Sequence, residues 1–314
     1  MARLVFLDQN AWVVLAQGAW DKAKYPREHA ALTTIVEGVK SGVIRVPLTF
    51  SNIYETTKIN VLRRRVNMAM TQSLISGGWV FRNRRAILAE TLSAYIADKH
   101  SIARETPAED WFLSDLWFES AADYSPEVFN ITISSAALNF IREDPGRALF
   151  EYLRFPDESV RLKAVQRYSA GSAELIARIE SRRALAIGEK LAMRKRIYGA
   201  RVTLDELDFI LATGRQLGLN WTSVTDIGSS LVCSIVADVP VLHIERELVV
   251  RLEDQPRDIN ENDLRDMLSF TAALPFTDVM VAEKQFVNLA RQARLGETFE
   301  TELVTSIFDF DPSN

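Results

Sequence analysis

The chain has 314 residues, of which 47% are hydrophobic and 25% are charged, and its formal net charge is -5 at pH 7. This composition is typical of a globular protein with one large core or two modest ones. The negative net charge argues against a broad basic surface for nucleic acid, because non-specific binding depends on clustered Lys and Arg. Any contact with nucleic acid must therefore be local.

Cysteine and histidine usage limits the metal chemistry. Cys233 is the only cysteine, which excludes an intrachain disulfide and a thiolate metal site. The histidines, His29, His100 and His243, are far apart in sequence and show no zinc spacing. Oxygen ligands remain, and they favour Mg²⁺ or Mn²⁺ if a metal binds.

Apolar runs in the chain are short. None reaches the length of a membrane span, and the amino-terminal run is interrupted by Asp8 too early for the core of a signal peptide. We therefore expect no membrane association and a cytoplasmic location, in a reducing compartment.

The first predicted elements are a buried strand at 4–7 and a helix that begins after Asp8. Asn10 is the polar residue two positions beyond the acid. An acid at the end of a first buried strand is a frequent ligand position in α/β folds. An aspartate that caps the next helix is equally common, so both interpretations of Asp8 stay open here.

A second strand is predicted at 43–48, followed by a helix that carries Glu55 in its first turns. Glu55 either brings a second carboxylate to the same sheet edge as Asp8 or is an acid favoured by the helix dipole.

Basic residues follow in the same helix, including Lys58, Arg63 and Arg64. Together with the arginines between 82 and 85 they form the densest basic clusters of an acidic chain. They are either a solvated helix face or a set of contacts to a phosphate backbone.

Residues 86–224 have long helical periodicities and few strand-like runs. We therefore expect a helical insertion that divides a discontinuous domain formed by 1–85 and 225–314. Such an insertion is a natural surface for a second copy of the chain or another protein. Five of its aromatic residues are expected to pack in the core rather than stack on bases: Trp111, Phe112, Trp117, Phe118 and Tyr124.

The carboxy-terminal part combines an acid-led helix near Asp266, a turn at Pro275 and a short buried strand, 279–282, that ends at Glu283. A helix start and a strand end can meet at the carboxyl edge of a parallel sheet, which makes Asp266 and Glu283 candidate neighbours. Carboxylates held together raise each other's pKa unless a cation lies between them. Alternatively, Asp263 and Asp266 are helix-start acids and Glu283 begins a solvated turn.

In chain order these segments resemble the PIN domain superfamily of metal-dependent nucleases. The matching motifs are Leu-Asp-Gln-Asn at 7–10, Val-Pro-Leu-Thr-Phe-Ser-Asn-Ile-Tyr-Glu at 46–55, Asp266, and Val-Ala-Glu at 281–283. The resemblance covers roughly residues 1–85 and 225–310 and implies a three-layer α/β fold with a central parallel sheet. In this family the last acid is often Asp after Thr, whereas here Glu283 follows Ala282.

The resemblance implies an endoribonuclease that hydrolyses phosphodiester bonds with one or two Mg²⁺ or Mn²⁺ ions. Asp8, Glu55 and Asp266 would hold the metal, with Glu283 as a ligand or as the group that orients water. The implied supporting or alternative ligands are Asn10, Asp263 and Asp278, and the implied contacts to nucleic acid are Lys58, Arg63, Arg64 and Lys284. RNA is favoured over DNA by the resemblance alone.

Two other functions fit parts of the sequence. One is a PIN-like scaffold that has lost catalysis and binds partners through its helical insertion. The other is a phosphatase with Asp8 as the nucleophile, although such enzymes usually carry a second acid where this chain has Asn10.

Overall fold

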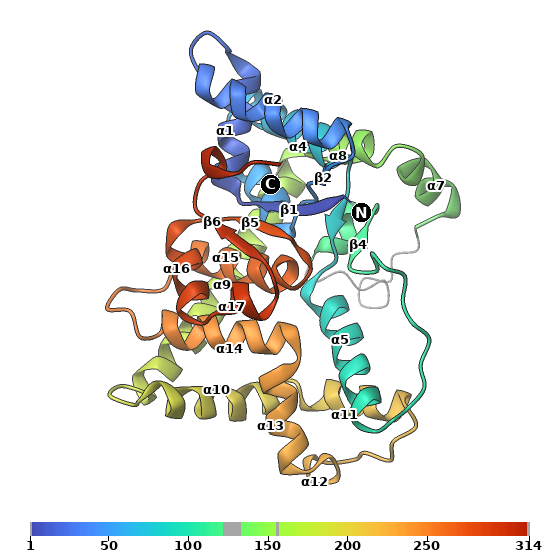
Figure 1. Ribbon diagram of the computed structural model, residues 1–314, viewed down its shortest axis with the longest axis vertical. Coiled ribbons are helices and arrows are strands. Elements are labelled where there is room, and N and C mark those ends of the chain that lie inside the picture. Colours follow the sequence, from blue (N-terminus) through green and yellow to red (C-terminus); the bar gives the residue numbers. More distant parts are fainter. Residues whose placement is uncertain (1, 122–132, 155–156, 313–314) are drawn as a thin grey trace.

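The computed structural model describes residues 2–121, 133–154 and 157–312. The protein is 68% helical and has a four-stranded, all-parallel sheet at its centre (Figure 1). The strands are β1 (Arg3–Leu7), β2 (Ile44–Arg45), β5 (Val279–Val281) and β6 (Glu302–Val304), in the spatial order β2-β1-β5-β6. The predicted α/β class and central parallel sheet are confirmed.

Both faces of the sheet are buried. In β1, Leu4 and Phe6 point into one core, whereas Val5 and Leu7 point into the other. Successive side chains of a strand alternate between faces, so a strand that is covered on both sides must be apolar throughout. This is why β1 is a continuous apolar run in the sequence.

The helices of one face come from the amino-terminal part and from one later helix (Figure 1). Their core contains the fully buried Trp12, Leu15 and Ile35 together with Val5 of β1. The helices are α1 (Gln9–Trp20), α2 (Pro26–Lys40), α4 (Leu62–Ser76) and α8 (Pro145–Arg154).

The opposite core lies below the sheet in Figure 1 and is built largely from carboxy-terminal helices. Phe270 and Phe286 pack there with ring centroids 5.7 Å apart. The principal helices are α5 (Arg84–Lys99), α14 (Pro240–Leu252), α15 (Glu261–Ala273) and α16 (Lys284–Gln292).

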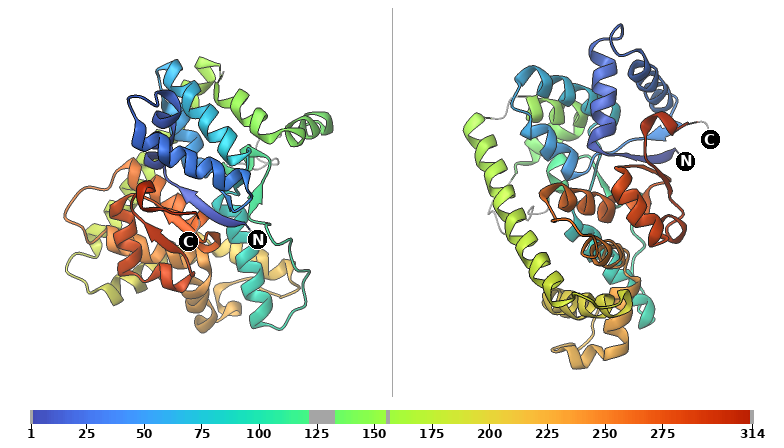
Figure 2. Two further views of the ribbon diagram at one scale, coloured as in Figure 1. Left: turned by 45° about the horizontal axis from the view of Figure 1, so that its top comes forward. Right: turned by 90° about the vertical axis from the view of Figure 1, so that its left-hand side faces the viewer.

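Two further helices complete the surroundings of the sheet edge. α3 (Phe50–Lys58) packs against α15, and α9 (Glu158–Leu185) runs along one side of the molecule from these helices down to α10 (Leu191–Asp205), as Figure 2 shows. The remaining elements are β3 (Val80–Phe81), β4 (Leu113–Ser114), η1 (Trp117–Ser120), α7 (Ser135–Glu143), α11 (Leu207–Gln216), α12 (Val224–Ile227), α13 (Ser229–Asp238), η2 (Leu274–Phe276), α17 (Leu295–Thr298) and η3 (Ile307–Asp309). In the ranges that the structure covers, no helix has the length and apolar character needed to span a bilayer.

The apolar run at 43–48 serves two sheets. Ile44 and Arg45 pair with β1, whereas Leu48 forms a bridge to Val80. Pro47 lies between them and has no amide to donate, so the pairing with β1 cannot continue through it.

The middle of the chain is mostly helical, as expected, but it also supplies β4, which pairs with β3 in a two-stranded antiparallel sheet whose connection contains α5. Ile87 of α5 lies in the same core as Phe6, and Leu149 of α8 lies in the other core. The middle segment therefore contributes to both cores of the sheet. The division at 85 and 225 stays a prediction.

Trp111, Phe112 and Trp117 of the middle segment pack against the two cores and stay partly exposed. Phe112 stacks on Phe276 with ring centroids 4.2 Å apart, and Trp117 stacks on Tyr152 at 3.7 Å. Tyr124 lies outside the residues that the structure describes.

Candidate functional site

Asp8 follows β1 directly and caps α1. Its amide donates a hydrogen bond to the Val281 carbonyl at 2.9 Å, and its Oδ1 accepts one from the Ala11 amide at 2.8 Å. The helix-capping role is confirmed, and the ligand role stays a prediction. The pKa of Asp8 is raised to about 6, chiefly by burial and then by the carboxylates of Glu55 and Glu283, whereas the hydrogen bond from the Ala11 amide lowers it.

Glu283 lies at the end of the neighbouring strand. The Ala282 amide donates to the Val304 carbonyl at 3.0 Å, which extends the sheet to the residue before the acid. Glu283 itself is exposed and occupies the position before α16 without capping that helix. Asp8 and Glu283 thus end two adjacent parallel strands and face the same edge.

A cleft of about 220 Å³ opens at this edge between the starts of α1 and α16. Its polar lining comes from residues that directly follow strands or begin helices: Asp8, Asn10, Glu283, Lys284, Thr305 and Ser306. Amide groups at two helix starts favour a negatively charged group in such a place.

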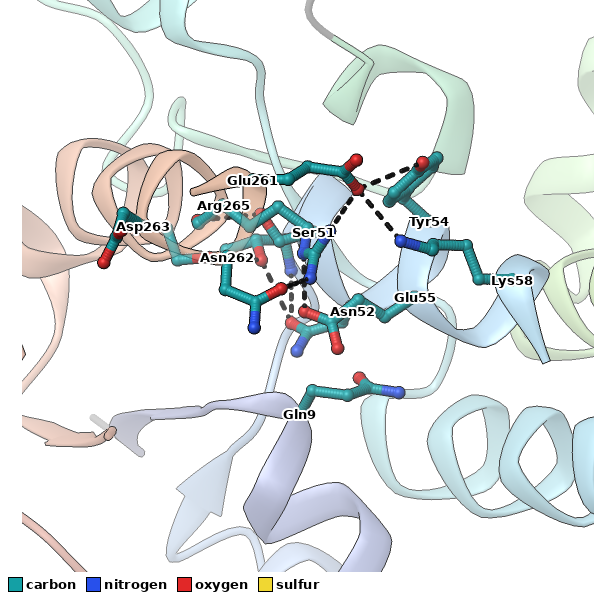
Figure 3. Close-up of polar contacts among 12 residues, drawn as sticks. Gln9, Ser51, Asn52, Tyr54, Glu55, Lys58, Glu261, Asn262, Asp263 and Arg265 are labelled. Atoms are coloured by element: carbon teal, nitrogen blue, oxygen red, sulfur yellow. Dashed lines mark hydrogen bonds and ion pairs between the residues drawn. The ribbon is translucent and has the colours of Figure 1, made fainter. Parts of the chain in front are cut away.

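Glu55 is positioned by the first turn of α3. The Asn52 side chain donates to the Leu7 carbonyl at 3.3 Å, and the Ser51 hydroxyl donates to the Arg265 carbonyl at 3.0 Å. Residues three and four positions apart share a helix face, so Glu55 points toward the end of β1 and the start of α15 (Figure 3). Burial raises its pKa, whereas the Arg265 guanidinium lowers it.

Asp266 lies in α15, next to the carbonyl that Ser51 contacts. Burial raises its pKa to about 8, and the charges of Glu283, Asp8 and Glu55 contribute in that order. Because each of these acids acts on Asp266, the structure brings Asp8, Glu55 and Glu283 within electrostatic range of Asp266. We call these four residues the acid cluster.

Arg265 is the buried cation beside the acid cluster. Its Nε lies 3.1 Å from Glu55 Oε1, and its other nitrogens donate to Glu261 and Asn262 (Figure 3). Its side chain is only 7% exposed. A buried guanidinium with carboxylate partners on two helices fixes the relative position of α3 and α15.

Glu261 extends this network to a third helix. It accepts hydrogen bonds from Lys58 at 2.9 Å and from Ser169 of α9 at 3.0 Å. The Tyr54 hydroxyl lies 3.4 Å from the same carboxylate, and its ring packs on Tyr168 with centroids 4.0 Å apart. α3, α9 and α15 are therefore joined through one carboxylate.

The structure does not bring Asp263 and Asp278 into the acid cluster as free carboxylates. Asp263 closes the capping box of α15, where its side chain accepts from the Asn260 amide at 2.8 Å and from Arg257. It is the helix-start acid that one sequence interpretation described. Asp278 accepts from the Leu4 amide at 2.6 Å, at the amino end of β5 and thus the opposite edge of the sheet from Glu283.

The basic residues predicted to contact nucleic acid lie in different parts of the structure. Lys284 lines the cleft, whereas Lys58 is ion-paired with Glu261. Arg63 and Arg64 line a groove between α1 and α4, where the Arg63 guanidinium stacks on Trp20 at 3.7 Å from the ring centroid.

The acid cluster offers carboxylate oxygens, the ligands that a hard divalent cation prefers. Its side chains are not arranged around a single point where an ion could bind. Across 2–121, 133–154 and 157–312, no three His, Cys, Asp or Glu side chains are grouped so that they could hold one ion. Electrostatic effects act over longer distances than the roughly 2.0–2.6 Å at which oxygen ligands contact Mg²⁺ or Ca²⁺. The raised pKa values of Asp8 and Asp266 nevertheless describe an environment that a cation would relieve.

Comparison with known proteins adds no relative. No family model, curated protein or solved structure matches the chain.

Arg265, Glu261 and Ser306 did not emerge from the sequence as site residues. The four-residue spacing of Glu261 and Arg265 on a helix indicates an ion pair. Ser306 follows the last strand, and the sheet-edge argument applied to Asp8 and Glu283 extends to it. Nothing in the sequence indicates that Ser169 of α9 reaches the same network.

Proposed function

We propose that the protein is a metal-dependent endoribonuclease with a PIN-like fold. The observation that carries the proposal is the acid cluster, whose members directly follow β1 and β5 or lie on α3 and α15. Burial, together with the charges of the other three acids, raises the pKa of Asp266 to about 8. Carboxylates that repel one another in a folded protein are kept together at a cost, and a divalent cation offsets that cost. The parallel sheet with ligand groups at its carboxyl edge supports the same assignment.

Asp8, Glu55, Asp266 and Glu283 would hold Mg²⁺ or Mn²⁺. When bound, such an ion makes a nucleophile from water and stabilises the charge on the leaving oxygen of a phosphodiester. Asp8 is held by the Ala11 amide through Oδ1, and Glu55 is held by Arg265. Both carboxylates are thereby oriented before any ligand arrives.

The cleft supplies the substrate contacts. Lys284 and the amides at the starts of α1 and α16 favour a phosphate beside Asp8 and Glu283. Without a cation, a pKa of about 8 keeps Asp266 largely protonated at pH 7, which lowers the repulsion within the acid cluster.

Cleavage of a labelled single-stranded RNA with Mn²⁺ or Mg²⁺ tests the proposal, with the parent compared with Asp8→Asn and Asp266→Asn. We expect cleavage by the parent that requires the metal and is lost in both variants. Glu174→Gln, an exposed carboxylate on α9, is the matched control and should cut like the parent. Equal cleavage by all four proteins would contradict the proposal.

A scaffold without catalytic activity is the second candidate. The observation that favours it is the lack of three converging metal-binding side chains in the described part of the chain. A groove of about 640 Å³ between α10 and α13 would then be the surface to test for partners. No RNA cleavage together with no stabilisation by metal would favour this function.

A further inference from the structure

The groove between α1 and α4 has the chemistry of a stacking surface for bases. We call it the α1–α4 groove. It has a volume of about 570 Å³ and buried Ala16 and Met68 beneath it. Its other lining residues are Val13, Gln17, Trp20, Tyr25, Ile59, Val61, Arg63, Arg64 and Asn67.

Trp20 is the largest apolar side chain on this surface and is 41% exposed. One side of its ring is covered by the Arg63 guanidinium at 3.7 Å. A guanidinium that lies over an indole ring still has N–H groups that can donate to phosphate. The pair therefore presents an aromatic ring and phosphate donors together.

The charge of the groove is positive, in contrast to the acidic chain. Neither Arg63 nor Arg64 forms an ion pair with any residue that the structure describes. Lys24 lies 5.2 Å from the Tyr25 ring centroid on the adjoining turn. The acid of that turn is Asp21, whose Oδ1 accepts hydrogen bonds from the backbone amides of Ala23 and Lys24 at 3.1 and 3.0 Å.

The wall of the groove opposite α1 is held in place by buried arginines. Arg65 donates to the Ile59 carbonyl at 2.8 Å, and Arg161 donates to the Thr57 carbonyl at 2.8 Å and to the Asn60 side chain at 3.1 Å. The connection between α3 and α4 is therefore ordered in advance, which lowers the entropic cost of binding.

Two helices connect the groove with the acid cluster. α1 begins directly after Asp8 and ends at Trp20, a length of about 18 Å for its twelve residues at 1.5 Å each. α3 carries Glu55 and ends at Lys58, immediately before the groove residue Ile59. A strand that lies along α1 would contact both sites.

We propose that the α1–α4 groove binds an unpaired nucleic-acid strand and leads it to the acid cluster. Trp20 is the stacking surface for a base, and Arg63 and Arg64 contact phosphates. This inference rests on the proposed nuclease function for its direction toward the acid cluster, but the binding itself can be measured without cleavage.

The test is fluorescence anisotropy with a labelled, unstructured twelve-nucleotide strand, as RNA and as DNA, in EDTA. Trp20→Ala should weaken binding about 5- to 150-fold, the range expected for loss of one stacked base. Trp20→Phe keeps a ring and should restore most of the affinity. Arg64→Ala should weaken binding and reduce the slope of log K against log salt by about 0.7, whereas Trp20→Ala should leave that slope unchanged.

Arg201→Ala is the matched control, because Arg201 is an exposed arginine on α10, away from the groove. It should bind like the parent. Binding by Trp20→Ala and Arg64→Ala that equals the parent, for both strands, would overturn the inference. Losses no larger than that of Arg201→Ala would overturn it as well.

Two further measurements separate this inference from the proposed function. Trp20→Ala should raise KM for RNA cleavage and leave kcat unchanged, whereas Asp8→Asn should abolish kcat and bind the strand normally in EDTA. If the parent binds the strand through Trp20 but cuts no RNA, the proposed binding by the groove is supported and the proposed nuclease function is contradicted. If the parent cuts and the groove variants match it in KM, the nuclease stands and the groove fails.

Discussion

The guanidinium of Arg265 lies 3.1 Å from a carboxylate oxygen of Glu55, on a different helix 210 residues away in the chain. One member of the acid cluster is thus held by a buried cation of the protein itself. The same guanidinium also donates to Glu261, so a single side chain compensates carboxylates on α3 and α15. This side chain therefore links α3 to α15 beside the acid cluster.

Substitution of Arg265 by Met should destabilise the protein by roughly 1–3 kcal/mol, because it leaves two partly buried carboxylates without this partner. The measurement is denaturant unfolding of the variant and the parent. Arg178→Met is the matched control, since Arg178 also pairs with a glutamate four residues earlier on a helix but both side chains are about 70% exposed. The control should lose less than about 0.5 kcal/mol, and equal losses in the two variants would contradict the burial argument.

Asp266→Asn should stabilise the metal-free protein at neutral and alkaline pH. The pKa of Asp266 is about 8 in the folded protein and 3.8 in the unfolded chain, so the folded state binds the proton more tightly between these values. Stability of the parent therefore falls as pH rises from about 4 to about 8. The asparagine cannot ionise and should gain roughly 2–4 kcal/mol at pH 7, since each unit of pKa shift corresponds to about 1.4 kcal/mol.

Thermal unfolding in EDTA across pH 4 to 9 measures this difference. It should shrink toward pH 4. Asp8→Asn should also be more stable than the parent, and this difference should develop over a narrower pH range, from about pH 4 to about pH 6. A variant that is less stable than the parent at pH 8 would show that the Asp266 carboxylate is compensated in the folded protein.

Millimolar Mn²⁺ should raise the melting temperature of the parent by several degrees. An ion that binds only the folded state stabilises it by about 2.7 kcal/mol at a hundred times its Kd. The shift should disappear in Asp8→Asn and persist in Glu174→Gln, whose carboxylate is exposed on α9. An equal shift in all three proteins would place the ion elsewhere.

Gly78→Ala should destabilise the protein more than Gly42→Ala. Both glycines have positive φ, +81° and +72°, so both substitutions carry the cost of that conformation, about 1–2 kcal/mol. A Cβ at Gly78 would lie 2.2 Å from the backbone of Pro145, whereas a Cβ at Gly42 would meet nothing within 4 Å. Chemical denaturation measures the loss of stability in each variant, and the difference between the two variants reports the contact with α8. Equal losses would mean that α8 shifts to accept the added Cβ at little cost.

The central sheet could be predicted because burial on both faces leaves a continuous apolar run. The runs at 4–7 and 279–282 became β1 and β5 with boundaries within one residue. The placement of Asp8 and Glu283 at one edge followed from strand direction alone. The two-stranded β3–β4 sheet was missed because its strands have two residues each, too few for a period of two to show.

The helix-borne part of the candidate site was harder to predict. Asp266 and Glu55 lie on helices, and their approach depends on contacts such as Ser51 to the Arg265 carbonyl, which no local pattern encodes. Asp263 and Asp266 look alike in sequence, being three residues apart in one helix start. The structure separates them. Asp263 caps the helix and pairs with Arg257, whereas Asp266 lies within electrostatic range of the other three members of the acid cluster.

The sheet joins the beginning of the chain to its end, as the hydrogen bond from Leu4 to Asp278, 274 residues apart, makes plain. A ribosome releases β1 long before it has made β5, so the first strand emerges without the neighbour that carries Glu283. The nascent polypeptide therefore cannot hold the four members of the acid cluster together until α15 and β5 have been synthesised. An activity that needs the complete acid cluster, such as the proposed nuclease, can begin only after that point.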